Sequence, residues 1–302
     1  MALAKDLSAL AASERGIAPD QTPGITPALI KHWAALDDRD RAMAHPEARI
    51  RHSWSGKCSR AIAYLVGGEQ PTNPFTEADY YRFAIGKIVH EFWQQFAIPA
   101  LTEVGWTDLT AEYEMTTSDT AGRIVSAGHG DLIGTTPDGK RTKVEVKTIN
   151  GFGYKSILGL GKDPAGPRWG DLLQGSVNAD ASDCDELRMV YLSLELLSPS
   201  YANKVQAHEF NRFCAEWTFT REQWFPLAQV ERERWDSILA SVDAEIPVPR
   251  YIPDPDIPVD AIIVDPKSGR WDVTDDNGYI TNSGSTWHCN YCSFRHKCQI
   301  DS

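Results

Sequence analysis

The segment GDLIGTTPDGKRTKVEVKT, residues 130–148, constrains the fold of this chain more than any other stretch. Its two halves are rich in β-branched residues, and the sequence PDG at 137–139 between them has the order that a tight turn favours. The segment is therefore predicted to form a β-hairpin. On the second strand, a period of two places Glu145 and Lys147 on one face and the intervening valines on the other.

Folding of the hairpin brings Asp131, on the first strand, next to Glu145. Two carboxylates this close repel each other unless a cation lies between them, and Mg²⁺ or Mn²⁺ would suit their oxygen atoms. An alternative is a surface ladder of ion pairs in which Lys143, Glu145 and Lys147 face Asp131. The hairpin residues by themselves leave both interpretations open.

The triplet acid–any–Lys, which Glu145 and Lys147 form, is weak evidence on its own. Average composition yields about one copy in a chain of this size. Two further copies, DGK at 138–140 and DPK at 265–267, lie in turn sequences. We therefore expect Asp138 and Asp265 to be turn residues only.

The bulk composition, 302 residues of which 42% are hydrophobic and 24% charged, is that of a globular protein of one elaborated domain or slightly more. The net charge of −12 argues against a protein covered in DNA-binding cations but leaves room for a local basic groove. Nothing in the sequence is long and apolar enough to span a membrane, and Asp6 interrupts the short apolar N-terminus. We therefore expect a cytoplasmic protein without a secretory signal, in which paired cysteines indicate metal more often than a disulfide.

Hydrophobic periodicity and end signals predict helices and strands in an order typical of an α/β fold with a helical N-terminal layer. Thr26, before Pro27, and Ser55 are expected to cap the first two helices. The predicted helices are 25–44, 55–68, 77–101, 169–182 and 221–244, and the predicted strands are 110–117, 123–136, 142–149, 187–196 and 205–220. Helix 77–101 is expected to have a broad apolar face, made by Phe83, Ile85, Ile88, Val89, Phe92, Trp93 and Phe96. The expected division is a helical extension at 1–54, a core at 55–245, and a Pro- and Cys-rich segment at 246–302.

Helix 77–101 also carries His90. A single histidine on a mostly apolar helix is usually a core or rim residue, but this one precedes the Asp…Glu-x-Lys hairpin. Together the motifs G-x-x-x-H, G-x-x-D, E-x-K-T and a later helical Gln resemble the RecB-like branch of the PD-(D/E)XK nucleases, over about residues 55–300. The matching residues are Gly86, His90, Gly128, Asp131, Glu145, Lys147, Thr148 and Gln174. One departure is that the family helix often reads Gln-x-x-x-Tyr, whereas Asn178 follows Gln174 here.

The cysteines extend the resemblance. Three lie near the C-terminus with the spacing Cys-x2-Cys-x5-Cys, and Cys58 lies far upstream. This arrangement is similar to that of iron–sulfur nucleases, which include the CRISPR-associated Cas-four family, its phage-borne relatives and the helicase-nuclease AddB. The resemblance implies a four-iron four-sulfur cluster that pins the C-terminal tail to the N-terminal helices. Its ligands would be Cys58, Cys289, Cys292 and Cys298.

A local zinc site is the alternative for these cysteines. It would use Cys289, Cys292, His296 and Cys298 without the upstream cysteine. The remaining two cysteines, Cys184 and Cys214, have no partner pattern, and we expect them to be buried.

The resemblance implies a restriction-endonuclease-like core, a central mixed sheet flanked by helices, and a metal-dependent DNA exonuclease that prefers ends or single strands. Asp131 and Glu145 would hold Mg²⁺ or Mn²⁺, with His90 as a nitrogen ligand and the carbonyl of Val146 completing the shell. Lys147 would orient the attacking water or neutralise developing charge, and Gln174 would position Lys147 or the phosphate.

The implied pathways are recombination, repair, phage replication and CRISPR adaptation, with protein partners from recombination or adaptation. Two alternatives stay open: a structure-specific endonuclease on the same fold, and a non-cleaving DNA-binding subunit. Basic residues that could follow a DNA backbone are Lys57, Arg60, Lys87, Lys155, Lys162 and Arg168, and aromatic residues that could stack on bases are Trp54, Tyr64, Trp93 and Trp169.

Overall fold

The computed structural model describes residues 28–35, 45–119, 122–160, 165–202, 204, 212–253, 262–264, 271–273, 289 and 292–301. The chain divides into two compact units, one of residues 1–43 and 76–84 and one of residues 44–75 and 85–302. In the first unit, residues 28–35 are helical as expected, whereas the predicted cap Thr26 and the following Pro27 lie outside the described residues. The domain boundaries at 54 and 245 stay a prediction.

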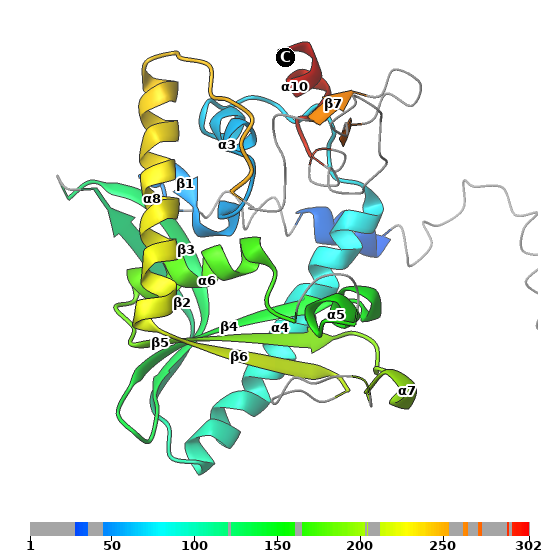
Figure 1. Ribbon diagram of the computed structural model, residues 1–302, viewed down its shortest axis with the longest axis vertical. Helices are drawn as coiled ribbons and strands as arrows, with labels where there is room; N and C mark the ends of the chain where they lie inside the picture. Colours follow the sequence, from blue (N-terminus) through cyan, green and yellow to red (C-terminus); the bar gives the residue numbers. More distant parts are fainter. Residues whose placement is uncertain are drawn as a thin grey trace, which may run out of the picture. The chain divides into compact units, whose positions relative to one another are not determined.

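The second unit is built on a mixed six-stranded sheet (Figure 1). Its order is β1-β3-β4-β5-β6, and β2 pairs with the other edge of β3. β4 and β5 are parallel, whereas β3 and β4 form the antiparallel hairpin that the sequence predicts. The strands are β1 (Ile50–Arg51), β2 (Thr107–Ser118), β3 (Ile124–Thr135), β4 (Arg141–Ile149), β5 (Glu186–Ser193) and β6 (Cys214–Thr220).

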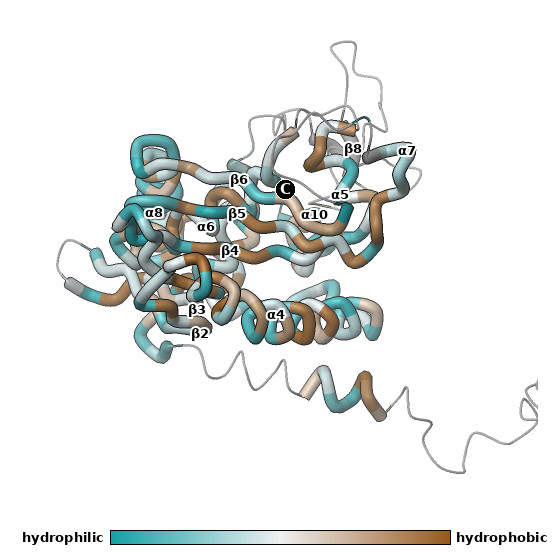
Figure 2. Tube along the Cα trace, turned by 90° about the horizontal axis from the view of Figure 1, so that it is seen from below, coloured by the Kyte–Doolittle hydropathy of each residue, from teal (hydrophilic) through white to brown (hydrophobic). Residues whose placement is uncertain are grey.

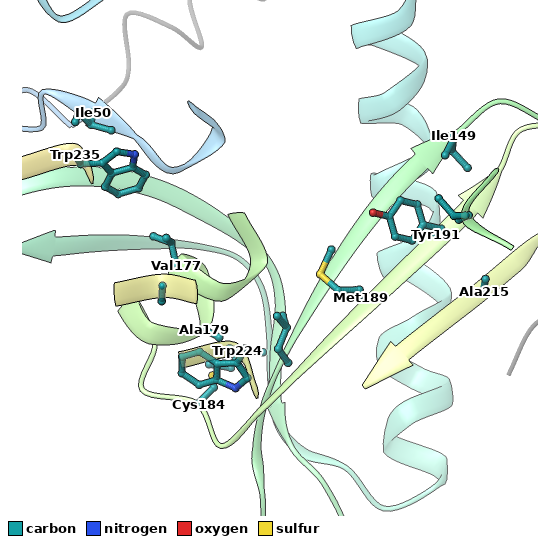
Figure 3. Packing of buried hydrophobic residues seen from close by; sticks show 14 of the residues in the cluster. Ile50, Ile149, Val177, Ala179, Cys184, Met189, Tyr191, Ala215, Trp224 and Trp235 are labelled. Atoms are coloured by element: carbon teal, nitrogen blue, oxygen red, sulfur yellow. The ribbon is translucent and has the colours of Figure 1, made fainter. Parts of the chain in front are cut away.

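Helices flank both faces of this sheet, so the predicted α/β class and mixed sheet are confirmed. On one face α6 packs against β4, β5 and α8 around a core that includes Trp224, Trp235 and the fully buried Cys184 (Figure 3). On the other face the later turns of α4 pack on the valines of β4. The helices are α3 (Ser59–Val66), α4 (Glu77–Glu103), α5 (Gly151–Ile157), α6 (Trp169–Ala181), α7 (Pro199–Ala202), α8 (Arg221–Asp243) and α10 (Arg295–Ile300).

Two local expectations are wrong. Ser55 does not cap a helix that begins there: it follows the short 3-10 helix η2 (His52–Trp54), and α3 begins only at Ser59. The reason is Gly56, whose φ of 73° breaks the helical path between them. The apolar face of α4 is also narrower than expected, because Ile88, Phe92 and Phe96 are 53%, 63% and 60% exposed. Figure 2 shows the hydrophobic and hydrophilic residues that alternate along α4.

The C-terminal segment packs on α3. The ring of Phe294 lies 5.2 Å from that of Tyr64, and the Tyr64 hydroxyl donates to Asp301 at 2.7 Å. Upstream of it, β7 (Ile262–Val264) and β8 (Trp271–Val273) form a two-stranded antiparallel sheet. The turn expected at Asp265 and the start of the strand predicted at 205–220 lie outside the described residues. Among the helices that the structure describes, none could cross a membrane.

Candidate active site

The sheet opens between β3 and β4. Their pairing ends at Leu132 and Val144, and β1 occupies the same edge of β3 only at residues 126–127. In the notch between these pairings, the Asp131 Oδ2 atom accepts a hydrogen bond of 2.7 Å from the backbone N–H of Val146. The carboxylate thus takes the place of a strand partner, and it lies where β4 separates from β3.

Glu145 lies beside Asp131 and faces away from the valines, as the period of two predicts. Its Oε1 atom is 2.8 Å from the ammonium of Lys147, and its Oε2 atom is 3.2 Å from that of Lys143. The Glu145 side chain is 2% exposed and that of Lys143 is fully buried. The surface-ladder interpretation is therefore wrong: helix α6 covers this face of the sheet, so these ion pairs are internal.

Helix α6 supplies two amide side chains to this cluster. Gln174 Oε1 accepts a hydrogen bond of 2.9 Å from the Lys147 ammonium. One turn later, Asn178 Nδ2 donates to Glu145 Oε2 at 2.9 Å. Residues four apart lie on the same side of a helix, so both amides point toward β4.

Helix α4 closes the other side of the notch. His90 Nδ1 lies 3.4 Å from Asp131 Oδ1. One turn later, the buried Gln94 donates through Nε2 to the Asp131 carbonyl at 3.2 Å and to Glu112 Oε1 at 2.6 Å. The helix thereby fixes both the carboxylate and the backbone of Asp131.

Charge compensation keeps these groups ionised. Burial alone would raise the pKa of Asp131, but the His90 hydrogen bond and the charges of Lys143 and Lys147 hold it well below its usual range. Burial likewise opposes ionisation of Glu145, yet the two lysines lower its pKa, and the carboxylates raise the pKa of both lysines. Two carboxylates and two ammonium groups therefore balance each other.

The donor types in the notch fit a hard divalent cation. Carboxylate oxygens retain lone pairs beyond the hydrogen bonds that they accept here, and oxygen atoms are the ligands that such ions prefer. The side chains of Asp131, His90 and Lys147 are 15%, 24% and 20% exposed, so solvent reaches this end of the cluster. In the described part of the chain, no three His, Cys, Asp or Glu side chains converge as a ready ion cage.

Lys143 should matter for stability because it compensates a buried charge. Replacing Lys143 by methionine removes one ammonium from Glu145 and should lower the free energy of unfolding by about 3 kcal/mol. Urea denaturation would measure the change. The matched control is Lys140→Met in the neighbouring turn, where the ammonium is 50% exposed and the effect should be small. Equal stabilities for the two variants would contradict the internal role of Lys143.

A chain of buried polar groups leads from Glu145 toward β2. Asn178 Oδ1 lies 2.9 Å from His52 Nδ1, and His52 Nε2 lies 3.0 Å from Ser126 Oγ, which contacts the hydroxyl of Thr117. The strand leaves room for the imidazole at Gly128, where a Cβ atom would come within 2.8 Å of the His52 ring. Burial lowers the pKa of His52 to about 4, and the charge of Arg232 acts in the same direction, against smaller opposing contributions from Asn178, Glu145 and Asp180.

The neutral His52 predicts a pH-dependent stability. The unfolded chain binds a proton at His52 near its ordinary pKa of about 6.5, whereas the folded chain binds it only near pH 4. Stability is therefore complete above pH 6.5 and is lost as the pH falls toward 4, by about 3 kcal/mol for this residue. Denaturation curves of wild type and His52→Asn across this window measure the difference. Parallel pH dependence in both proteins would contradict it.

A second cluster lies between α3 and the C-terminal segment. Cys58, Cys289, Cys292 and Cys298 line one cavity that is partly open to solvent. Burial, together with the neighbouring thiols, raises the pKa of Cys289 to about 12. The fold brings these residues together from segments that lie far apart in the sequence. The other two described cysteines are not among the residues that line this cavity: Cys184 is buried, as expected, and Cys214 is half-buried.

Local contacts support this arrangement of thiols. The backbone N–H of Phe294 donates to Cys292 Sγ at 3.4 Å, and Arg60 Nη1 is 3.9 Å from Cys298 Sγ. His296, the fourth ligand of the local zinc alternative, is exposed and is not among the residues that line the cavity. Cys58, in contrast, lines that cavity together with the three C-terminal cysteines.

The structure brings together every residue that the sequence suggested for the notch: His90, Asp131, Glu145, Val146, Lys147 and Gln174. Asp138 is a turn residue as expected, exposed and hydrogen-bonded to Thr136. Sequence reasoning missed Gln94, His52 and the inward direction of Asn178. Spacing offered a signal for two of them, since Gln94 and Asn178 each follow a site residue by one helical turn. His52 had no local signal.

Comparison with known proteins adds information on the fold. No family model and no curated protein sequence matches the chain. The crystal structure of SSO0001 resembles it with a TM-score of 0.50 and 15% identity, over 92% of this chain and 97% of that one. At that identity the likeness shows a shared fold.

Two exonucleases resemble smaller parts of the chain. The alkaline exonuclease LHK-Exo from Laribacter hongkongensis has a TM-score of 0.38 and 15% identity, over 62% of this chain and 78% of that one. A phage-related exonuclease from Haemophilus somnus 129PT has a TM-score of 0.31 and 14% identity, over 51% and 69%.

Proposed function

We propose that the protein is a divalent-metal-dependent deoxyribonuclease whose active site is the notch between β3 and β4. One observation carries the proposal: the part-buried carboxylate of Asp131 and the buried carboxylate of Glu145 meet a lysine, Lys147, at the end of the described cluster that solvent reaches. Two carboxylates with a lysine at the mouth form an arrangement that can bind a cation and stabilise negative charge on a phosphate.

The chain's own residues would have distinct roles. Asp131 and Glu145 would hold Mg²⁺ or Mn²⁺, with the Val146 carbonyl and the imidazole of His90 as further donors. When bound, the cation supplies Lewis acidity toward the phosphate and a water of lowered pKa. Lys147 would orient the attacking water or neutralise charge that develops on the phosphate oxygens. Gln174 would hold the Lys147 ammonium in place, since their contact already restricts it.

A surface beside the notch supports DNA ends or single strands as the substrate. Immediately after β4, Phe152 on α5 is 83% exposed. On the same helix, the Lys155 ammonium lies 4.2 Å from the ring centre of Tyr201, and Lys204 lies 5.5 Å from it. Exposed aromatic rings next to cations suit unpaired bases and their phosphates. This local cationic surface is compatible with a net charge of −12.

The cysteine cavity supports a structural four-iron four-sulfur cluster held by Cys58, Cys289, Cys292 and Cys298. Thiolates are the usual ligands of such clusters. The four thiols line one cavity together, as the ligands of a single bound group must. A cluster bound there would link the C-terminal segment to the start of α3.

The exonuclease assignment is tested with linear and circular single-stranded DNA, Mn²⁺ and anaerobically purified protein. We expect release of nucleotides from the linear strand, no cleavage of the circle, and no reaction in excess chelator. Cleavage of the circle would favour the structure-specific endonuclease instead. Binding without cleavage of either DNA would favour the non-cleaving DNA-binding subunit. Recombination, repair, phage replication and CRISPR adaptation, with their protein partners, are the processes in which such an activity would serve.

A further inference from the structure

We propose that Asn178 is a positioning residue for Glu145 and that His52 in turn positions Asn178. The proposal deepens the proposed nuclease function and rests on it. It is carried by the buried chain of contacts Glu145–Asn178–His52–Ser126, in which each side chain is 2% exposed or less.

The direction of each hydrogen bond in the chain follows from donor and acceptor chemistry. An ionised carboxylate only accepts, so Asn178 must present its NH2 group to Glu145 Oε2. The Asn178 carbonyl oxygen then faces His52 and also only accepts, which requires the proton of His52 on Nδ1.

The outer half of the chain continues the same direction. A neutral imidazole that carries its proton on Nδ1 has a bare Nε2, and Nε2 accepts from the Ser126 hydroxyl at 3.0 Å. The low pKa of His52 agrees with that neutral form. Ser126 Oγ is then free to accept from the Thr117 hydroxyl that contacts it. Every donor in the chain therefore points toward Glu145.

The two amide side chains of α6 therefore have different roles. Gln174 approaches the Lys147 ammonium at the solvent-accessible end, whereas Asn178, one turn further, is fully buried behind Glu145. Asn178 is thus directed away from any bound DNA. It fixes the inner oxygen of a carboxylate whose outer oxygen faces Lys147. Side chains that orient a metal-binding carboxylate contribute strongly to metal affinity and activity.

The kinetic test compares Asn178→Ala with Ser176→Ala, a substitution at an equally buried position of the same helix that lies outside the chain. We expect Asn178→Ala to lower kcat, or to raise the Mn²⁺ concentration for half-maximal rate, by about 10–100-fold at unchanged KM for DNA. Lys143 still contacts Glu145 in this variant, which favours a folded protein. Ser176→Ala should keep both parameters near wild type. A purely structural role for Asn178 would make the two variants alike and overturn the proposal.

Conservative variants of His52 separate its two ring nitrogens. The amide nitrogen of an asparagine reaches about the position of Nδ1, and that of a glutamine reaches about the position of Nε2. We therefore expect His52→Asn to keep most of the activity that His52→Gln loses. The opposite order, or equal activities, would contradict the inferred path through Nδ1.

A readout without DNA or metal keeps this proposal distinct from the proposed function. Nitrogen chemical shifts of the His52 imidazole at pH 7 should report a neutral ring protonated at Nδ1, and Asn178→Ala should remove that preference. A ring protonated at Nε2, or a cationic ring, would overturn the proposal even if the protein cleaves DNA. The expected tautomer in a protein that cleaves no DNA would instead contradict only the nuclease assignment.

Discussion

Replacing Lys147 by methionine should lower the rate constant of DNA cleavage by about 10²–10³-fold, with DNA binding close to wild type. The methionine retains the length of the side chain but removes the ammonium that lies 2.8 Å from Glu145 and 2.9 Å from Gln174. In this variant the Lys147 ammonium no longer stabilises the negative charge that develops in phosphodiester hydrolysis. Single-turnover cleavage of end-labelled DNA measures the loss.

The same chain provides a matched control for this variant. Lys140 belongs to the other described acid–any–Lys triplet, with Asp138 two residues before it in the hairpin turn. Lys140→Met should cleave DNA at about the wild-type rate, because the ion-pair partners of Lys140, Asp138 and Glu186, lie outside the notch. Equal losses in the two variants would show that general charge, not the notch, determines activity.

If the proposed cluster is bound, replacing Cys58 by alanine should release its iron and lower the thermal midpoint by about 10 °C or more. Thiolate-bound structural metals can contribute about 10 kcal/mol of apparent binding free energy at neutral pH, and loss of only part of it gives a shift of this size. The C-terminal segment, which packs on α3 around the cavity, should become sensitive to proteases. Iron content, visible absorbance and thermal denaturation of anaerobically purified protein would measure these effects.

Cys184→Ala is the control for the cysteine variant. Cys184 is fully buried in the main core and lies outside the cavity, so its replacement should reduce stability through packing while the iron content stays at the wild-type level. A Cys58→Ala protein that keeps its iron and its thermal midpoint would contradict the structural role of the cluster.

The hairpin shows what local sequence can predict. Turn chemistry at 137–139 fixes the connection, and the period of two then determines which side chains share a face with Glu145. The register that follows brings Asp131 beside Glu145, and the structure has this arrangement. Local rules also distinguish Asp138, whose turn position leaves it exposed.

The burial of the charged face could not be predicted in this way. A period of two tells which residues share a face but not what covers that face. From the local sequence, Lys143 would be expected on the surface. It is buried because α6, from a later part of the chain, covers this face of the sheet. The same limit applies to α4, where an apolar sequence at Ile88, Phe92 and Phe96 does not ensure a packing partner.

Long-range contacts explain the remaining differences. His52 reaches Asn178 across 126 residues and depends on the absence of a side chain at Gly128. No local pattern around η2 indicates that contact. Among the cysteines, sequence spacing relates the three C-terminal residues to one another. The grouping of Cys58 with them came from the family resemblance. In the structure, Cys58 lines the same cavity as these three residues.

The central claim, that phosphodiester cleavage takes place at the notch, is tested most directly by Asp131→Asn and Asp138→Asn. Binding and single-turnover cleavage of the same labelled DNA, with Mn²⁺, would be measured for both variants beside wild type. We expect both variants to bind DNA, Asp138→Asn to cleave at the wild-type rate, and cleavage by Asp131→Asn to fall by at least about 100-fold. Undiminished cleavage by Asp131→Asn would contradict this claim, because the active site would then lie elsewhere in the molecule.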